Sequence, residues 1–180
     1  RGETSLILFP TKALAQDQLV KLLALVDASP DLQGKVIPAT LDGDCSHAQR
    51  SLVAASANII LTNPDTLHAA ILPHWKGLYR PLLVNLRYVV IDEAHMYEGV
   101  FGAHIAMVLA RLYRVATLCR GANNDKDKDK APITFLACSA TMAHPDHHFR
   151  LLCPISKHDP VTILTSQNDG SPRSSKNFFV

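Results

Sequence analysis

Short apolar runs alternate along the chain with segments whose apolar residues recur at helical spacing. The apolar runs cover residues 5–9, 35–39, 58–62, 88–91 and 133–138, with a weaker sixth run at 161–164. Residues 12–27 and 100–118 carry apolar side chains three or four positions apart, which predicts two amphipathic helices. Near-continuous apolar strands that alternate with helices are typical of a parallel sheet covered on both faces, so an α/β fold is predicted.

Polar residues follow four of these runs at the point where each run ends. They are Pro10-Thr11-Lys12, Thr62-Asn63-Pro64-Asp65, Asp92-Glu93 and Ser139-Ala140-Thr141. In parallel α/β sheets, ligands bind beyond the carboxyl ends of the strands. The four clusters are therefore expected to meet at one edge of the sheet and to form a binding site there.

The acid pair Asp92-Glu93 ends the sequence YVVIDE and is the most informative of the four clusters. Ionised carboxylates are costly beside an apolar core unless they are paired or metal-bound. A metal-phosphate site explains the pair, with Asp92 holding Mg²⁺ through oxygen or water ligands and Glu93 orienting an attacking water. A helix N-cap with an acidic first turn explains the same two acids in isolation, and the other three clusters favour the metal-phosphate site.

Four segments, taken together and in this order, resemble the superfamily-two helicases: FPTKALAQDQL (9–19), TNPD (62–65), DEAH (92–95) and SAT (139–141). The flanking segments narrow the resemblance to the RecQ-four-related (Hrq-type) DNA helicases of fungi and their bacterial relatives. The segments that look like these helicases are LDGDCSHAQR, TNPDTLHAAILPHW, NLRYVVIDEAHMYEGVFGAHIAMVLARL and DGSPRSSK. The resemblance implies a RecA-like, P-loop NTPase type of sheet. Residues 1–165 would form part of a first motor domain, and 166–180 a linker toward a second RecA-like domain.

The resemblance also implies ATP and Mg²⁺ as cofactors and assigns roles at this edge. Asp92 would organise Mg²⁺ on the ATP phosphates, and Glu93 would polarise the hydrolytic water. His95 would contact the SAT segment, where Ser139 and Thr141 would couple hydrolysis to domain movement. The alternatives are a satisfied helix histidine for His95 and ordinary strand-end caps for Ser139 and Thr141.

Nucleic-acid contacts are expected at the ends of the earlier runs. Thr11 offers a hydroxyl and Lys12 a charge at a predicted helix N-terminus, whose free amides favour a phosphate. Thr62 and Asn63 precede a second helix, and Gly43 matches a family glycine that lets the chain approach the strand closely. A helix cap with a solvated lysine, an Asn-Pro turn and a simple turn are the alternative explanations. Such contacts carry no base information, so binding is expected to be sequence-tolerant and salt-sensitive.

A phosphate-gripping loop is missing from this sequence, since GxxxxGK followed by Ser or Thr occurs nowhere. In the family this loop and its strand stand just upstream of Arg1, so the chain is expected to be a fragment that lacks that strand. Alone it should hydrolyse ATP negligibly and leave residues 133–138 with an unpaired, aggregation-prone edge. The parent is expected to step along single-stranded or forked DNA, 3′ to 5′ by family analogy. A truncated, inactive binding domain and a DEAH-class RNA helicase are the alternatives.

Composition narrows the function further. The formal net charge is +2, so phosphate binding must be local rather than a property of the whole chain. The cysteines are scattered without a CxxC pair, which predicts reduced thiols in an intracellular protein, with Cys138 as a small core residue. No run of about 18 apolar residues occurs, so no membrane span is predicted.

Three further features have simple structural explanations. Trp75 is predicted to fill a core edge, with stacking on a base as the alternative. His144, His147 and His148, near Asp146, are expected to be surface histidines rather than a metal site. Residues 123–130, NNDKDKDK, are expected to form a solvated loop.

Overall fold

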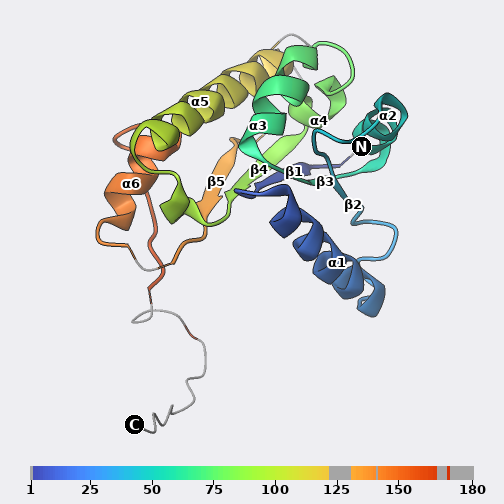
Figure 1. Cartoon of the computed structure of the whole chain (residues 1–180), viewed down its shortest axis with the longest axis horizontal. Helices are drawn as coiled ribbons and strands as arrows, with labels where there is room; N and C mark the ends of the chain where they lie inside the picture. Colours follow the sequence, from blue (N-terminus) through green and yellow to red (C-terminus); the bar gives the residue numbers. More distant parts are fainter. Residues whose placement is uncertain (1, 122–130, 141, 166–169, 171–180) are drawn as a thin grey trace, which may run out of the picture.

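Five parallel strands form one sheet in the order β2-β3-β1-β4-β5. The computed structural model describes residues 2–121, 131–140, 142–165 and 170 (Figure 1). The strands are β1 (Thr4–Leu8), β2 (Pro38–Thr40), β3 (Ile59–Thr62), β4 (Leu86–Ile91) and β5 (Thr134–Ala137). The five predicted strands are confirmed, with β2 beginning three residues later than predicted. The sixth is wrong, because 161–164 has no regular secondary structure and Leu164 is 76% exposed, too exposed for a core strand.

The helices lie on both sides of this sheet (Figure 1). The two predicted helices are confirmed as α1 (Lys12–Ala28) and α5 (Gly99–Gly121). The shorter ones are α2 (His47–Ser56), α3 (Pro64–Thr66), the π-helical turn η1 (Leu67–Ile71), the 3₁₀ turns η2 (Leu72–His74) and η3 (Ala94–Met96), α4 (Arg80–Val84) and α6 (Pro145–Leu152). The predicted helix-covered parallel sheet is therefore correct.

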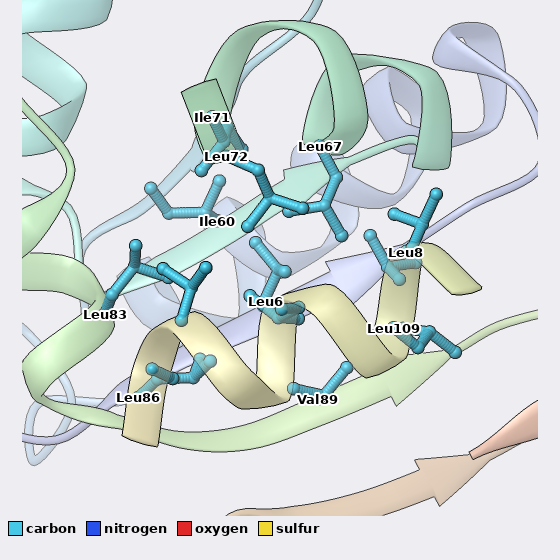
Figure 2. Close-up of a cluster of buried hydrophobic side chains, with 14 of the residues drawn as sticks. Leu6, Leu8, Ile60, Leu67, Ile71, Leu72, Leu83, Leu86, Val89 and Leu109 are labelled. Carbon is cyan, nitrogen blue, oxygen red and sulfur yellow. The ribbon is translucent and has the colours of Figure 1, made fainter. Parts of the chain in front are cut away.

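Side-chain alternation along the strands separates two apolar layers. Leu6 and Leu8 of β1 and Ile60 of β3 point into the larger layer beneath α5, η1 and α4 (Figure 2). Ile7 belongs to the smaller layer beneath α1, with Phe9. Leu6 is fully buried, and truncating such a leucine to Ala costs about 2–5 kcal/mol of stability. These layers fix the sheet rigidly and so fix where the loops at its carboxyl edge lie.

Helix α5 is long and apolar enough to cross a membrane by length and composition, the one such helix in the described part of the chain. Its apolar stripe, however, includes Ile105, Leu109 and Leu112, all fully buried in the larger layer. Polar residues such as Arg111 and Arg114 occupy other positions of the same helix. We therefore assign α5 as a core helix that packs along the sheet.

Strand β5 lies at the edge of the sheet and pairs with β4 alone among the described strands. Leu136 on this strand is 47% exposed, and Cys138 just after it is also exposed. The prediction that Cys138 is a core residue is therefore wrong, because β5 has a described neighbour on one side only. The prediction of an apolar edge at this strand is correct.

Candidate functional site

The acid pair lies where β4 ends at the carboxyl edge of the sheet. The backbone N–H of Asp92 donates to the carbonyl of Leu8 at 2.9 Å, which continues the ladder between β4 and β1 by one residue. Asp92 Oδ1 then accepts the Glu93 N–H at 3.0 Å. Glu93 has φ 50° and ψ 44°, the one non-glycine residue with positive φ in the described part of the chain. A left-handed backbone here costs on the order of 1 kcal/mol and turns the chain sharply out of the strand.

Register brings the SAT segment beside the DEAH box. Ile91 pairs with Ala137 across β4 and β5, and the Ala94 N–H donates to the Cys138 carbonyl at 2.9 Å. This ladder sets Ser139 and Ala140 opposite His95, as predicted for the SAT contact. His95 Nδ1 lies 3.4 Å from Ser139 Oγ and 3.3 Å from the backbone nitrogen of Ala140. Thr141, the other predicted coupling residue, lies outside the described residues.

The same ring nitrogen also faces the acid pair, with Glu93 Oε2 at 3.4 Å from His95 Nδ1. A backbone N–H can only donate, so the contact with Ala140 requires Nδ1 to be unprotonated. A charged hydrogen bond to Glu93 requires Nδ1 to carry the proton. The two contacts therefore belong to different protonation or tautomer states of His95. The ring can thus hydrogen-bond either to the acid pair or to the SAT segment through the same nitrogen.

His148 on α6 also holds the DEAH box, a role that the sequence analysis missed. Its Nε2 lies 2.9 Å from the carbonyl oxygen of Ala94, and the side chain is partly buried. The carbonyl can only accept, so Nε2 donates. The prediction of a surface histidine is wrong for His148, whereas His144 and His147 are exposed as predicted. Spacing alone carried no signal, because the contact spans 54 residues.

The acid pair creates a negative field. Partial desolvation of the sulfur, and then the charges of Asp92 and Glu93, raise the pKa of the Cys138 thiol. Burial, and then Asp92 and Asp65, likewise raise the pKa of the Tyr97 phenol. Among the described residues neither Asp92 nor Glu93 is paired with Lys or Arg, and His95 is the basic side chain beside Glu93. A cation would neutralise this field.

This donor set fits Mg²⁺ rather than a metal held wholly by protein. No group of three or more His, Cys, Asp or Glu ligands occurs in the described part of the chain. Mg²⁺ retains several waters and is usually bound through one or two carboxylates plus substrate phosphates. Asp92, partly exposed at the strand end, is suited to hold such an ion directly or through water.

Buried packing fixes the segment that follows the box. Tyr97 is 1% exposed, and its ring lies 5.8 Å from that of Phe101. Gly102 lies so close to Tyr97 that an added Cβ would stand 2.2 Å from the Tyr97 carbonyl oxygen. Only glycine fits at position 102, which explains why the GVFG segment ends in glycine.

The start of α1 meets the LDGD loop at the same edge of the sheet. Thr11 caps the helix, its hydroxyl accepting the Leu14 N–H at 3.3 Å. Lys12 forms an exposed ion pair with Asp44, whose hydrogen bond and charge raise the pKa of Lys12. The helix-cap explanation of Thr11 is therefore correct, and Lys12 is not simply a solvated lysine. Both side chains remain exposed.

Gly43 in the LDGD loop is exposed, and a Cβ added to it would have no atom within 4 Å. Its φ is not positive either, so neither packing nor backbone conformation in this chain requires glycine. The loop is held instead by Arg50, whose Nη2 donates to the Gly43 carbonyl at 3.1 Å and the Asp42 carbonyl at 3.3 Å. The prediction that Gly43 admits a close external approach stays a prediction.

Thr62 and Asn63 differ in whether their side chains are free to contact a ligand. Thr62 is 1% exposed, and its hydroxyl donates to the Leu41 carbonyl at 2.6 Å. Its predicted role as a direct phosphate donor is corrected, because the hydroxyl is buried and already used to hold β3 to the loop after β2. Asn63 is partly exposed and caps α3, with Oδ1 accepting the Thr66 N–H at 2.7 Å. Its side-chain NH₂ group has no acceptor among the described residues.

Trp75 packs, partly buried, against the larger apolar layer, as predicted for a core edge. The remaining expectations, the solvated loop at 123–130 and the linker beginning at 166, lie outside the described residues except for Gly170.

The sheet, its helix-covered faces and the acid pair at the end of β4 define the class of RecA-like α/β domains. The family comparison agrees: the DEAD/DEAH box helicase family matches residues 1–148, and the chain belongs to that family. The predicted superfamily-two resemblance is confirmed.

The relatives also bear out the finer resemblance. The chain is 37% identical to the ATP-dependent helicase HRQ1 of Saccharomyces cerevisiae over 98% of its own length, and 45% identical to the uncharacterized ATP-dependent helicase YprA of Bacillus subtilis over 78%. It matches 15% and 17% of those two proteins. The crystal structure of the DUF1998 helicase MrfA bound to DNA and AMPPNP superposes with a TM-score of 0.71 at 41% identity, over 83% of this chain and 19% of that one.

Proposed function

We propose that this chain provides the Mg²⁺-binding and water-activating part of an ATP-dependent DNA helicase motor. The observation that carries the proposal is the convergence of Asp92, Glu93, His95 and Ser139 at one strand edge, where no Lys or Arg among the described residues pairs with the two acids. Family membership supports it, because the relatives bear the name ATP-dependent helicase.

Each residue of the cluster has a distinct task in hydrolysis. Mg²⁺ supplies charge neutralisation on the ATP phosphates, and Asp92 would hold it. Glu93 accepts a hydrogen bond from the attacking water and orients its oxygen toward the γ-phosphorus. The bond from the γ-phosphorus to the ADP oxygen then breaks, giving ADP and inorganic phosphate. His95 senses the charge at Glu93 through Nδ1 and passes the change to Ser139 and Ala140, with Thr141 proposed as part of that segment.

The nucleic acid would lie across the loops at the same edge of the sheet. Thr11, Lys12, Gly43 and Asn63 offer a hydroxyl, a charge, an open backbone and an amide to successive phosphates, while Thr62 positions the loop between them. A DNA strand, single or forked, is favoured over RNA because the similar MrfA structure contains DNA. A second RecA-like domain of the intact protein is proposed to close over this edge and to move with hydrolysis, stepping 3′ to 5′ by family analogy.

Unwinding assays with the intact protein test this function. Matched forked DNA and RNA duplexes are compared, with ATP and Mg²⁺, alongside Asp92→Asn. We expect unwinding of the DNA fork only, abolished by EDTA and by Asp92→Asn. Unwinding confined to RNA would assign the protein to the RNA helicases. DNA binding without any ATP hydrolysis would mean an inactive binding domain instead.

A further inference from the structure

A cleft of about 550 Å³ opens beside α2, away from the acid pair. It lies between the first half of α2 and the segment from residue 73 to residue 79, which joins η2 to α4. Its chemically distinctive lining residues are His47, Arg50, His74, Trp75, Lys76 and Tyr79. Neither the acid-pair site nor the proposed phosphate contacts at the sheet edge account for it.

The charge of the cleft selects an anionic ligand. None of its lining residues is Asp or Glu, whereas Arg50 and Lys76 are cationic. His74 adds an imidazole edge, because its Nδ1 lies 3.0 Å from the Ala70 carbonyl and donates there, which leaves Nε2 for a ligand. A cationic cleft that also holds an imidazole nitrogen suits a phosphate linked to a polar heterocycle.

An aromatic ring lies in the same cleft. Trp75 is partly exposed, and Lys76 Nζ stands 5.4 Å from its ring centroid. Tyr79 of the same lining is 1% exposed and fixes the segment to the core. Lys76 itself is exposed, so its side chain can leave the ring for a phosphate while a base takes its place. Stacking on an aromatic ring next to basic residues is how proteins bind single strands without reading sequence.

Arg50 joins this cleft to the loop where the nucleic acid is proposed to run. Its Nε donates to the Cys45 carbonyl at 2.9 Å, and its Nη2 donates to the Gly43 carbonyl. The same guanidinium thus holds the LDGD loop and forms one wall of the cleft. The cleft therefore adjoins the loop that carries Gly43.

We propose that the cleft binds one nucleotide of single-stranded nucleic acid, with the base stacked on Trp75 and its phosphate beside Lys76 and Arg50. This inference rests on the proposed function, since it extends the same nucleic-acid path past Gly43. It assigns Trp75 a second role beyond the core edge. An acidic peptide is the competing ligand of the same charge.

Photocrosslinking of the intact protein locates the contact directly. A fluorescein-labelled thymidine oligonucleotide carrying 5-iodouracil is irradiated with the protein, and the adducts are mapped by mass spectrometry. We expect an adduct on the peptide that contains Trp75, lost when excess unlabelled oligonucleotide competes. Adducts that form elsewhere but never on this peptide would overturn the inference.

Fluorescence anisotropy with the same oligonucleotide measures the energetics. Trp75→Leu should weaken binding about tenfold and Trp75→Phe much less, because Phe keeps a stacking face. Lys76→Ala, on an exposed residue that leaves the core intact, should lower the salt slope of log K by about 0.7. The matched control is Lys157→Ala, in the exposed turn after α6, a helix at the other end of the molecule from α2 (Figure 1). It should change neither the affinity nor the salt slope.

The variants also separate this inference from the proposed function. If Lys12→Ala weakens binding while Lys76→Ala and Trp75→Leu do not, the cleft belongs to another ligand, such as an acidic peptide, and the inference fails alone. If the wild-type protein binds no oligonucleotide, the proposed function fails with it. If Trp75→Leu unfolds the protein, Lys76→Ala and the adduct map decide.

Discussion

Glu93 Oε2 and His95 Nδ1 lie 3.4 Å apart at the end of β4. The same His95 nitrogen is 3.3 Å from the backbone nitrogen of Ala140, which can only donate to it. One atom therefore connects the Glu93 carboxylate to the strand end that follows β5, and it cannot serve both neighbours with the same proton. A change of charge at Glu93 thus has a direct route to the SAT segment.

Replacing His95 should separate hydrolysis from movement. His95→Ala removes the link but leaves Asp92 and Glu93 in place, so we expect nucleic-acid-stimulated ATPase activity to fall less than tenfold. The factor by which DNA unwinding falls should be at least ten times the factor by which ATPase activity falls. Parallel ATPase and unwinding assays on the intact protein measure the two rates. Ser139→Ala, which leaves the contact with Ala140, is the milder comparison. Equal loss of both activities in His95→Ala would contradict the coupling role.

The thiol of Cys138 reports on the charge of the acid pair. Partial desolvation of the sulfur and the two carboxylates raise the pKa of Cys138, so less thiolate is present at pH 8 than in an ordinary cysteine and alkylation should be slow. Glu93→Gln removes one negative charge, lowers the pKa and should speed iodoacetamide labelling of Cys138 severalfold. Mass spectrometry of the labelled peptide gives the rate at several pH values. Unchanged labelling across the pH range would show that Glu93 does not act on this thiol.

Gly102 should tolerate no side chain. An added Cβ would meet the Tyr97 carbonyl at 2.2 Å, and the obstacle is backbone rather than a flexible side chain. We expect Gly102→Ala to destabilise the fold by about 3 kcal/mol, at the upper end for overpacking. Thermal or urea unfolding measures this. Gly43→Ala, where nothing lies within 4 Å of the added carbon, is the matched control and should leave stability nearly unchanged.

Asp44 should restrain nucleic-acid binding. Its carboxylate holds Lys12 in an exposed ion pair and places a negative charge on the proposed path of the phosphates. Asp44→Asn frees the lysine, so we expect affinity for a thymidine oligonucleotide to rise about threefold at low salt, with a smaller gain at high salt. Asp17→Asn breaks the comparable exposed pair with Lys21, 2.7 Å apart within α1, and should have no effect. Weaker binding by Asp44→Asn would argue against Lys12 as a phosphate contact.

The sheet and its two long helices were predictable because apolar periodicity records burial directly. The run at 161–164 shows the limit of that signal. A short apolar run that pairs with no strand has the same sequence pattern as a run that forms a strand. Cys138 was misplaced for a related reason: an edge strand and a central strand have the same sequence character, and only pairing distinguishes them.

The site was predictable in its residue types but not in all its contacts. The order of the motifs placed Asp92, Glu93, His95 and Ser139 near strand ends. They meet because β4 and β5 are neighbours in a register that sets them opposite. The bond from His148 to the Ala94 carbonyl and the buried hydroxyl of Thr62 depend on distant packing that no local pattern contains.

Single-turnover ATP hydrolysis by the intact protein tests the central claim most directly. Glu93→Gln keeps the size of the side chain and one acceptor oxygen but removes its charge. With single-stranded DNA and Mg²⁺ present, we expect the hydrolysis rate to fall at least about a hundredfold while the Kd for ATP changes less than threefold. A hydrolysis rate within threefold of wild type at unchanged ATP affinity would contradict the assignment of Glu93 as the residue that activates water.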